Sequence, residues 1–150
     1  MRINKLTDYS IVILTNMVIN GDKKMYTAKE LSEITDVPLP TVTRILKMLS
    51  NKELLDSQQG PQGGYSLTKS AENISVREVI EAMEGPIALT ECSDDGCGCA
   101  YETNCAVGKP WQKINKVIND VLQNINLAEM GMKDESQKLI KLTDITEMSF

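Results

Sequence analysis

The segment between residues 27 and 67 constrains the fold most strongly, because it carries several start and stop signals for local structure. It opens with Thr27-Ala28-Lys29-Glu30, a capping box in which a hydroxyl and a carboxylate satisfy free backbone amides at a helix start. The sequence Asp36-Val37-Pro38 then predicts a turn, since the residue before a proline avoids the helical conformation. Pro40 suits the first turn of a second helix. The apolar positions expected to face inward are Ala28, Leu31 and Ile34 in the first helix and Val42, Ile45, Leu46 and Leu49 in the second.

A hairpin is expected directly after these two helices. Residues 54–67, LLDSQQGPQGGYSL, are typical of a strand, a glycine-rich turn and a second strand. Two short helices joined by a tight turn form a helix-turn-helix, and a hairpin that follows the second helix is a wing.

Two further helices complete the expected domain. In residues 8–19 the positions that share one helical face are Ile11, Leu14, Thr15 and Val18. Residues 75–78, Ser-Val-Arg-Glu, form a second capping box, and the helix that it begins is stopped by Gly85-Pro86. We therefore expect residues 1–85 to form a winged helix-turn-helix domain, mainly α-helical with a small β-wing.

The sequence from about residue 109 to residue 126 predicts a long amphipathic helix. Its apolar residues recur at intervals of three and four: Trp111, Ile114, Val117, Ile118, Val121, Leu122 and Ile125. This stripe could lie back on its own domain, but the winged domain already has a core, so pairing with the stripe of a second copy in a two-fold homodimer is favoured. The remaining chain is then a cysteine-rich cluster-binding loop at 86–108, a dimerisation helix at 109–130 and a flexible tail at 131–150.

Charge and apolar content limit the partners of the chain. Residues 1–83 carry ten Lys/Arg and ten Asp/Glu, whereas residues 84–150 carry six and eleven, which gives the net charge of −5. A neutral first half lacks the basic surface expected of a DNA-binding domain and is mild evidence against a nucleic-acid partner. The N-terminus lacks the features of a secretory signal, and no apolar run is long enough to span a bilayer, so we expect a cytoplasmic protein with no membrane partner.

All four cysteines lie within the fourteen residues CSDDGCGCAYETNC, with the spacing C-x4-C-x-C-x5-C. In a reducing cytoplasm such a cluster favours a metal site or a redox switch over a disulfide framework. The spacing matches neither paired zinc knuckles nor the common ferredoxin runs, so an iron-sulfur cluster, zinc and a thiol switch stay open, in that order. The chain has no histidine to activate a nucleophilic cysteine, so we expect no enzyme and no small-molecule substrate.

The second helix of the helix-turn-helix offers polar side chains for DNA on its expected outer face. These are Thr41, Thr43, Arg44 and Lys47, short hydroxyls and cations that can reach base edges and phosphates. An ordinary solvated face would look the same. The combination of helix-turn-helix, wing and dimer helix favours double-stranded operator DNA, because a dimer spaces two such helices about one turn of DNA apart.

Several motifs in the right order resemble one family. The GGYSL wing end, ISVREVIEAMEGPIALTEC, the cysteine loop and CAVGKPWQKIN are similar to the iron-sulfur-sensing winged-helix regulators that include IscR and NsrR. EGPIALTECS followed by C-x5-W is most similar to the branch that regulates the SUF cluster-assembly operon. The resemblance spans residues 1 to about 130. It implies a homodimeric repressor that senses iron-sulfur cluster status, with a 2Fe-2S cluster favoured over a 4Fe-4S cluster.

The resemblance also implies the ligands. Cys92, Cys99 and Cys105 match the ligand loop of the family, and Cys97 is a departure from it. The histidine that completes the set in IscR-like members would fall at Gly108, which excludes it. NsrR-like members use an aspartate in the first helix of the other subunit, and Asp8 matches that residue. The fourth ligand is therefore Asp8 or Cys97, although Asp8 alone would also suit the macrodipole of a helix start.

The wing departs from the family at one position. Many members carry an arginine just before the first glycine of the wing, where this chain has Gln59 before Gly60. A neutral side chain there removes one charge-assisted contact to DNA. We expect Gln59 and Gly60 still to lie at the DNA, with altered affinity or site choice.

Overall fold

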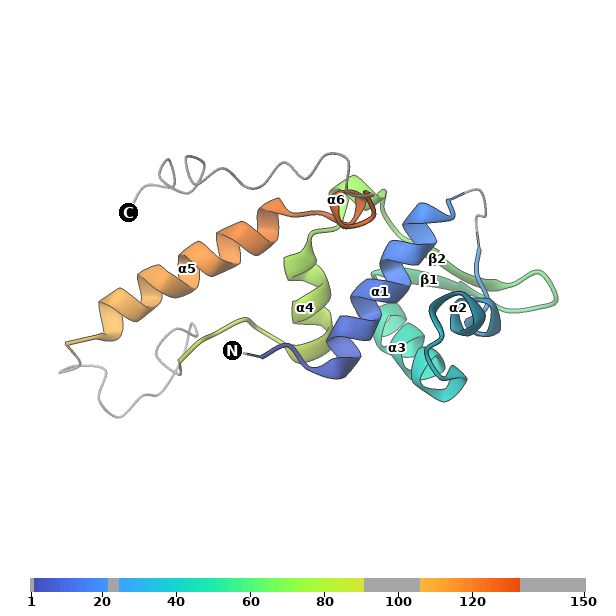
Figure 1. Ribbon diagram of the computed structural model, residues 1–150, viewed down its shortest axis with the longest axis horizontal. Coiled ribbons are helices and arrows are strands. Elements are labelled where there is room, and N and C mark those ends of the chain that lie inside the picture. The colour runs from blue at the N-terminus through green and yellow to red at the C-terminus, as the bar shows by residue number, and fades with distance from the viewer. Residues whose placement is uncertain (1, 22–24, 91–105, 133–150) are drawn as a thin grey trace.

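The computed structural model describes residues 2–21, 25–90 and 106–132 (Figure 1). In chain order the elements are α1 (Lys5–Ile19), α2 (Ala28–Thr35), α3 (Leu39–Asn51), β1 (Leu55–Gln58), β2 (Gly64–Leu67), the 3₁₀ helix η1 (Ala71–Asn73), α4 (Val76–Glu84), α5 (Gly108–Asn124) and α6 (Leu127–Met130). The predicted fold class, mainly helical with one small antiparallel sheet, is confirmed.

The helix α1 begins three residues earlier than expected, and its predicted inward face is partly confirmed. The Asn4 side chain accepts a hydrogen bond from the Leu6 amide at 2.7 Å and so caps the helix at Lys5. Leu14 is fully buried, and Ile11 and Val18 pack against the core while half-buried. The buried face also includes two polar residues that were not predicted, and the Ser10 hydroxyl donates to the Thr7 carbonyl oxygen at 2.6 Å. The full set of buried residues is Thr7, Ser10, Ile13, Leu14 and Met17.

The helix-turn-helix follows the prediction closely. The Thr27 capping box forms with both of its hydrogen bonds, and Asp36 ends α2 with a φ of 56° in the left-handed region. On α3 all four predicted core positions have no exposed surface. Ile34 is the exception to the prediction for α2, since 45% of it is exposed.

The wing is an antiparallel hairpin that is tied to the start of α2. Leu55 pairs with Leu67 at the open end of the hairpin, and Gln58 pairs with Gly64 next to the turn. The backbones of Tyr26 and Tyr65 exchange two hydrogen bonds, at 2.9 and 2.7 Å. A Cβ on Gly64 would lie 2.6 Å from the Tyr26 carbonyl oxygen, so this close approach requires glycine. The hairpin is thereby fixed relative to the helix-turn-helix.

The C-terminal elements differ from the expected single helix. The predicted dimerisation segment 109–130 comprises two helices, because the chain leaves α5 at Ile125 and pairs with the residues just before α4. The Val76 amide donates to the Ile125 carbonyl oxygen at 2.8 Å, and the Leu127 amide donates to the Ile74 carbonyl oxygen at 3.0 Å. Leu127 is fully buried and belongs to the core. Most of the predicted tail, 133–150, lies outside the described residues.

Figure 1 shows α1 to α4 and the hairpin as one body, with α5 extending from it on the side opposite the hairpin. The core lies between α1, α2, α3 and α4 and is closed by α6. Among the described residues, no helix has the length and apolar content needed to cross a membrane.

Candidate DNA-reading surface and cysteine segment

The helix α3 has two faces of different chemistry. One face packs into the core, and the other carries Arg44 and Lys47, both of which are exposed. Within the described part of the chain neither cation takes part in an ion pair. Cations that no carboxylate neutralises can contact phosphate groups or base edges. The structure therefore leaves these two predicted DNA-binding side chains available.

The two predicted threonines are less open. Thr41 and Thr43 are half-buried. The Thr43 hydroxyl donates to the Leu39 carbonyl oxygen one turn earlier, at 2.9 Å. With its proton used inside the helix, that hydroxyl can offer a base only its acceptor lone pairs.

The tip of the wing is polar and uncharged. Gln59 and Gly60 are both exposed, and residues 57–63 include no charged side chain. Gly60 has a φ of 110°, and a Cβ added there would contact nothing within 4 Å, so glycine serves the turn conformation there. The wing can contact DNA by hydrogen bonds, without the salt-dependent attraction that cations add.

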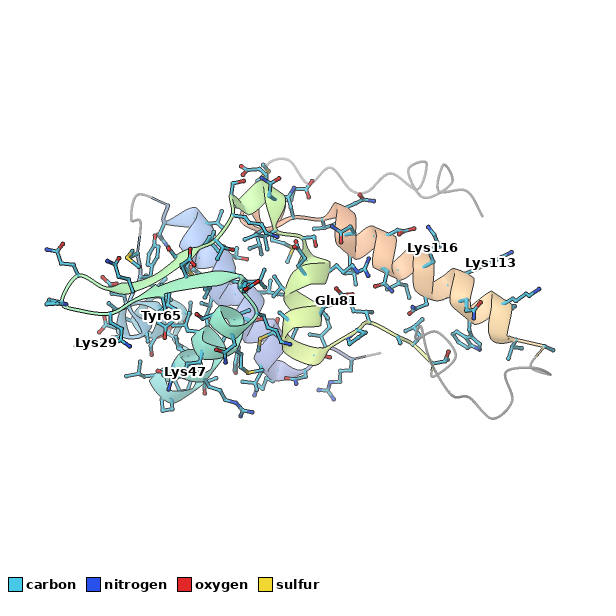
Figure 2. All side chains as sticks on the ribbon, turned by 180° about the vertical axis from the view of Figure 1, so that it is seen from behind. Lys29, Lys47, Tyr65, Glu81, Lys113 and Lys116 are labelled. Atoms are coloured by element: carbon cyan, nitrogen blue, oxygen red, sulfur yellow. The ribbon has the colours of Figure 1, made fainter. Side chains whose placement is uncertain are left out.

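The exposed lysines lie at two ends of the molecule. Figure 2 shows Lys29 and Lys47 on the helix-turn-helix, toward the hairpin, whereas Lys113 and Lys116 lie on α5 at the other end. Lys116 pairs with Asp120 at 2.6 Å. The predicted DNA-binding residues of α3 and the wing thus belong to one end of the molecule, away from α5.

The start of α1 is held on the end of α4. Glu84 Oε1 accepts hydrogen bonds from the Asn4 amide at 2.8 Å and from the Thr7 hydroxyl at 2.6 Å. Asp8 follows in the first turn of α1 and is exposed. Its side chain has no ion-pair or hydrogen-bond partner among the described residues. The carboxylate of Asp8 is therefore available as a ligand on a well-anchored helix start.

The four predicted thiolate ligands, Cys92, Cys97, Cys99 and Cys105, lie outside the described residues. Across residues 2–21, 25–90 and 106–132 no three metal-binding side chains come together. The chemistry of the donor set still fits an iron-sulfur cluster, because thiolates with one carboxylate can complete four ligands. The described residues on either side of this segment are Thr90 and Ala106.

One carboxylate of the winged body has a shifted pKa. Burial of Glu78 acts to raise its pKa, but hydrogen bonds from the Ser75 amide and the Lys69 ammonium outweigh burial and hold the pKa of Glu78 below its usual value. The Ser75 amide lies 2.8 Å from Glu78 Oε2, and the Lys69 ammonium lies 2.9 Å from Glu78 Oε1. Glu78 is thus the ionised half of the predicted capping box that begins α4.

The helix α5 packs on its own chain with an asparagine face. Asn115 and Asn119 are each only 8% exposed, whereas Trp111 is 38% and Ile114 is 45% exposed. The Leu89 amide donates to Asn115 Oδ1 at 3.2 Å, and Asn119 Nδ2 donates to the Ile87 carbonyl oxygen at 3.1 Å. The amides face the body, and the apolar stripe is exposed at its start, whereas its later residues, Val117, Ile118, Val121, Leu122 and Ile125, are half-buried.

Comparison with known proteins places the chain in a family. The Rrf2 family model, described as iron-dependent transcriptional regulator, matches residues 3–133. The chain belongs to the Rrf2 family. It is therefore a helix-turn-helix transcription regulator that binds DNA. This role agrees with the prediction that the chain is not an enzyme.

Individual proteins agree with this placement in the Rrf2 family. The transcriptional regulator IscR of Klebsiella pneumoniae is 28% identical over 135 residues, which cover 90% of this chain and 82% of the relative. The structure of CymR, the global cysteine regulator of B. subtilis, matches with a TM-score of 0.68 at 21% identity, covering 87% of this chain and 96% of CymR. The structure of T. potens IscR has a TM-score of 0.66 at 22% identity, covering 87% and 85%. The two structural likenesses show the shared winged-helix fold.

Sequence reasoning missed three side chains that hold the Rrf2 chain together around the cysteine segment. These are Glu84, Asn115 and Asn119. A signal for the asparagines was present, since they lie four residues apart and so share one face of the predicted helix. No sequence pattern separates Glu84 from the many exposed glutamates of helix ends.

Proposed function

We propose that this Rrf2 regulator is a homodimeric repressor that senses iron-sulfur cluster status and acts on SUF-type cluster-assembly genes in the cytoplasm. The observation that carries the proposal is the cysteine segment: four thiols within fourteen residues, in a chain without histidine. The description of the family as iron-dependent and the likeness to IscR support it. The choice of SUF-type genes rests on the motifs EGPIALTECS and C-x5-W.

DNA contact in this proposal comes from α3 and the wing. Arg44 and Lys47 are exposed and free of ion pairs within the described residues, and they would contact phosphates and base edges. Thr41 and Thr43 would add short contacts from the first turns of α3. Gln59 and Gly60 would bring the uncharged wing to the neighbouring groove.

The cluster in this proposal is held by Cys92, Cys99 and Cys105, with Asp8 of the second subunit or Cys97 as the fourth ligand. Asp8 is supported by its exposed carboxylate on a helix start that Glu84 anchors. A bound cluster would hold the thiolates together and would be gained or lost with iron supply and oxidants. A 2Fe-2S cluster is favoured over a 4Fe-4S cluster. Iron measurements on Asp8→Ala and Cys97→Ala separate the two candidates, since only the true ligand should lower cluster content.

Dimerisation in this proposal uses the open apolar stripe of α5. Trp111 and Ile114 are large, exposed and adjacent on one face. The outer face of α1 is also apolar, with Val12 37% and Ile19 50% exposed. A second copy that lays its α5 against these faces would bury both, and a closed two-fold dimer is the commonest arrangement. It would also bring Asp8 of one subunit toward the cysteine segment of the other.

The test is anaerobic purification followed by a visible absorption spectrum with iron and acid-labile sulfide counts, on the wild type and on Cys92→Ala. We expect a brown wild type and a variant that loses colour and sulfide together. Colourless protein with stoichiometric zinc, even after reconstitution with iron and sulfide, would contradict the proposal and favour a zinc-stabilised module. Metal-free protein whose DNA binding is switched by peroxide would favour a thiol switch instead.

A further inference from the structure

Two asparagines of α5 bind the backbone of residues 87–89. Asn115 and Asn119 are four residues apart on the helix, so their side chains share one face. The Leu89 amide donates to Asn115 Oδ1 at 3.2 Å, and Asn119 Nδ2 donates to the Ile87 carbonyl oxygen at 3.1 Å. One face of α5 therefore binds this irregular segment at two points.

The pairing runs antiparallel and is partly shielded from water. The earlier asparagine binds the later backbone residue, Leu89, and Asn119 binds Ile87. Asn119 Nδ2 also donates to the Asn115 carbonyl oxygen at 2.9 Å, which fixes the orientation of its amide. Asn115 and Asn119 are each only 8% exposed, so breaking these hydrogen bonds would leave amide groups that water reaches poorly.

The clamp joins the two flanks of the cysteine segment. Residues 87–89 follow α4 and end three positions before Cys92, while α5 begins three positions after Cys105. The far end of α5 is pinned separately, where Val76 and Leu127 bond to Ile125 and Ile74. The clamp therefore ties the entrance of the cysteine segment to α5 by polar contacts.

We propose that Asn115 and Asn119 couple the state of the cysteine segment to the orientation of α5. Through the α5 helices of the dimer, this orientation would set the relative position of the two α3 helices that contact DNA. This inference rests on the proposed function, since it names the residues that transmit its signal. Coupling requires a connection whose contacts differ between two states. A displacement at Cys92 would pass along residues 87–89 to the buried amides and so to the dimerisation helix.

Packing alone does not require these amides. Asn119 Oδ1 is buried and has no hydrogen-bond partner among the described residues, although the Nδ2 of the same amide makes two bonds. An apolar side chain would remove this unpaired acceptor, but it would leave the Ile87 carbonyl oxygen without its donor. The amide of Asn119 is therefore matched to the backbone of residue 87 and does more than fill space.

The test compares Asn119→Leu and Asn115→Ala with Gln123→Leu, a matched amide change at an exposed position of α5. In metal-free protein, hydrogen exchange at the Leu89 amide reports the clamp directly. We expect exchange to be about tenfold faster in Asn115→Ala, the effect of losing one buried hydrogen bond, and unchanged in Gln123→Leu. An unchanged rate in Asn115→Ala would overturn the clamp itself.

The second measurement is the ratio of DNA affinities of cluster-loaded and cluster-free protein, with cluster content measured by absorbance. We expect Asn119→Leu to keep its cluster content and dimeric state while the ratio falls toward one, and Gln123→Leu to keep the wild-type ratio. A wild-type ratio in Asn119→Leu would overturn the coupling role and leave the proposed function intact. A ratio of one in the wild type would instead overturn the proposed function, and the coupling with it.

Discussion

The winged body and the helix α5 bury their side chains in opposite ways. In the body, α3 turns Val42, Ile45, Leu46 and Leu49 fully inward and leaves its cations outside. In α5 the amides of Asn115 and Asn119 face inward, while Trp111 and Ile114 stay exposed. One region satisfies its apolar surface within the chain, and the other does not.

The difference indicates that the two regions have different requirements. A helix with an apolar face normally turns that face to the core. On α5 the polar residues Asn115 and Asn119 contact the flank of the cysteine segment, and the apolar stripe is exposed at Trp111 and Ile114 and half-buried further along. The exposed start of this stripe is where the proposed second copy would pack.

The largest expected effect separates the stability of the two regions. Leu46→Ala removes a fully buried side chain and should lower the free energy of unfolding by about 2–5 kcal/mol. Val107→Ala, which trims a 54% exposed side chain just before α5, should change it by less than about 0.5 kcal/mol. Urea unfolding followed by circular dichroism measures both. If the two variants lose equal free energy of unfolding, the side chain of Val107 must be as well packed as that of Leu46, which would contradict the exposure seen here.

A charge in the apolar stripe should act on association. Ile114→Glu places a carboxylate on the open face of α5 and should weaken the dimer by about 2 kcal/mol or more, with little change in helix content. Sedimentation equilibrium measures the dissociation constant, and Lys113→Glu on the neighbouring face is the matched control. A dimer that tolerates Ile114→Glu would move the interface away from this stripe.

The next effect is on DNA affinity and compares a cation of α3 with a cation of α5. Arg44→Ala should weaken binding to promoter DNA by about 1–3 kcal/mol, because it removes an exposed guanidinium of α3. Lys113→Ala removes the same charge from α5 and should leave binding nearly unchanged. Fluorescence anisotropy at several salt concentrations gives both affinities. If the two variants weaken DNA binding equally, the reading surface does not lie on α3.

The smallest effect is a pH dependence within the body. Because the pKa of Glu78 is lowered in the folded state, its stabilising contribution is present above the ordinary pKa of 4.5. It is lost as the pH falls from there through the lowered folded value. Glu78→Gln should therefore flatten the fall in stability below about pH 5, and Glu72→Gln on η1 should not. Urea midpoints at a series of acidic pH values test this, and parallel curves for wild type and Glu78→Gln would contradict it.

Local signals made most of the body predictable from the sequence. The capping boxes at Thr27 and Ser75 and the turn at Asp36 depend on contacts within a few residues, so their positions were correct. The inward face of α1 was predicted only in part, because Thr7 and Ser10 satisfy their hydroxyls locally or through Glu84 and are buried as well. Hydrophobic periodicity cannot detect such polar core positions.

The region around the cysteine segment was less predictable, for a different reason. The break after Asn124 depends on backbone pairing with residues 74–76, which are distant in sequence. The clamp of Asn115 and Asn119 likewise depends on a backbone segment 26 or more positions away. The ligand assignment of Cys92, Cys97, Cys99, Cys105 and Asp8 stays a prediction, as do the DNA contacts of α3 and the wing.

The most direct test of the central claim is the affinity of cluster-loaded and cluster-free protein for the promoter of the SUF-type assembly genes, measured anaerobically on one preparation. The account predicts that loaded protein binds at least about fivefold more tightly, the lower end of typical allosteric coupling. It also predicts that the Cys92→Ala variant behaves like the cluster-free form. Equal affinity of the loaded and cluster-free forms would contradict the claim that this Rrf2 regulator senses a cluster.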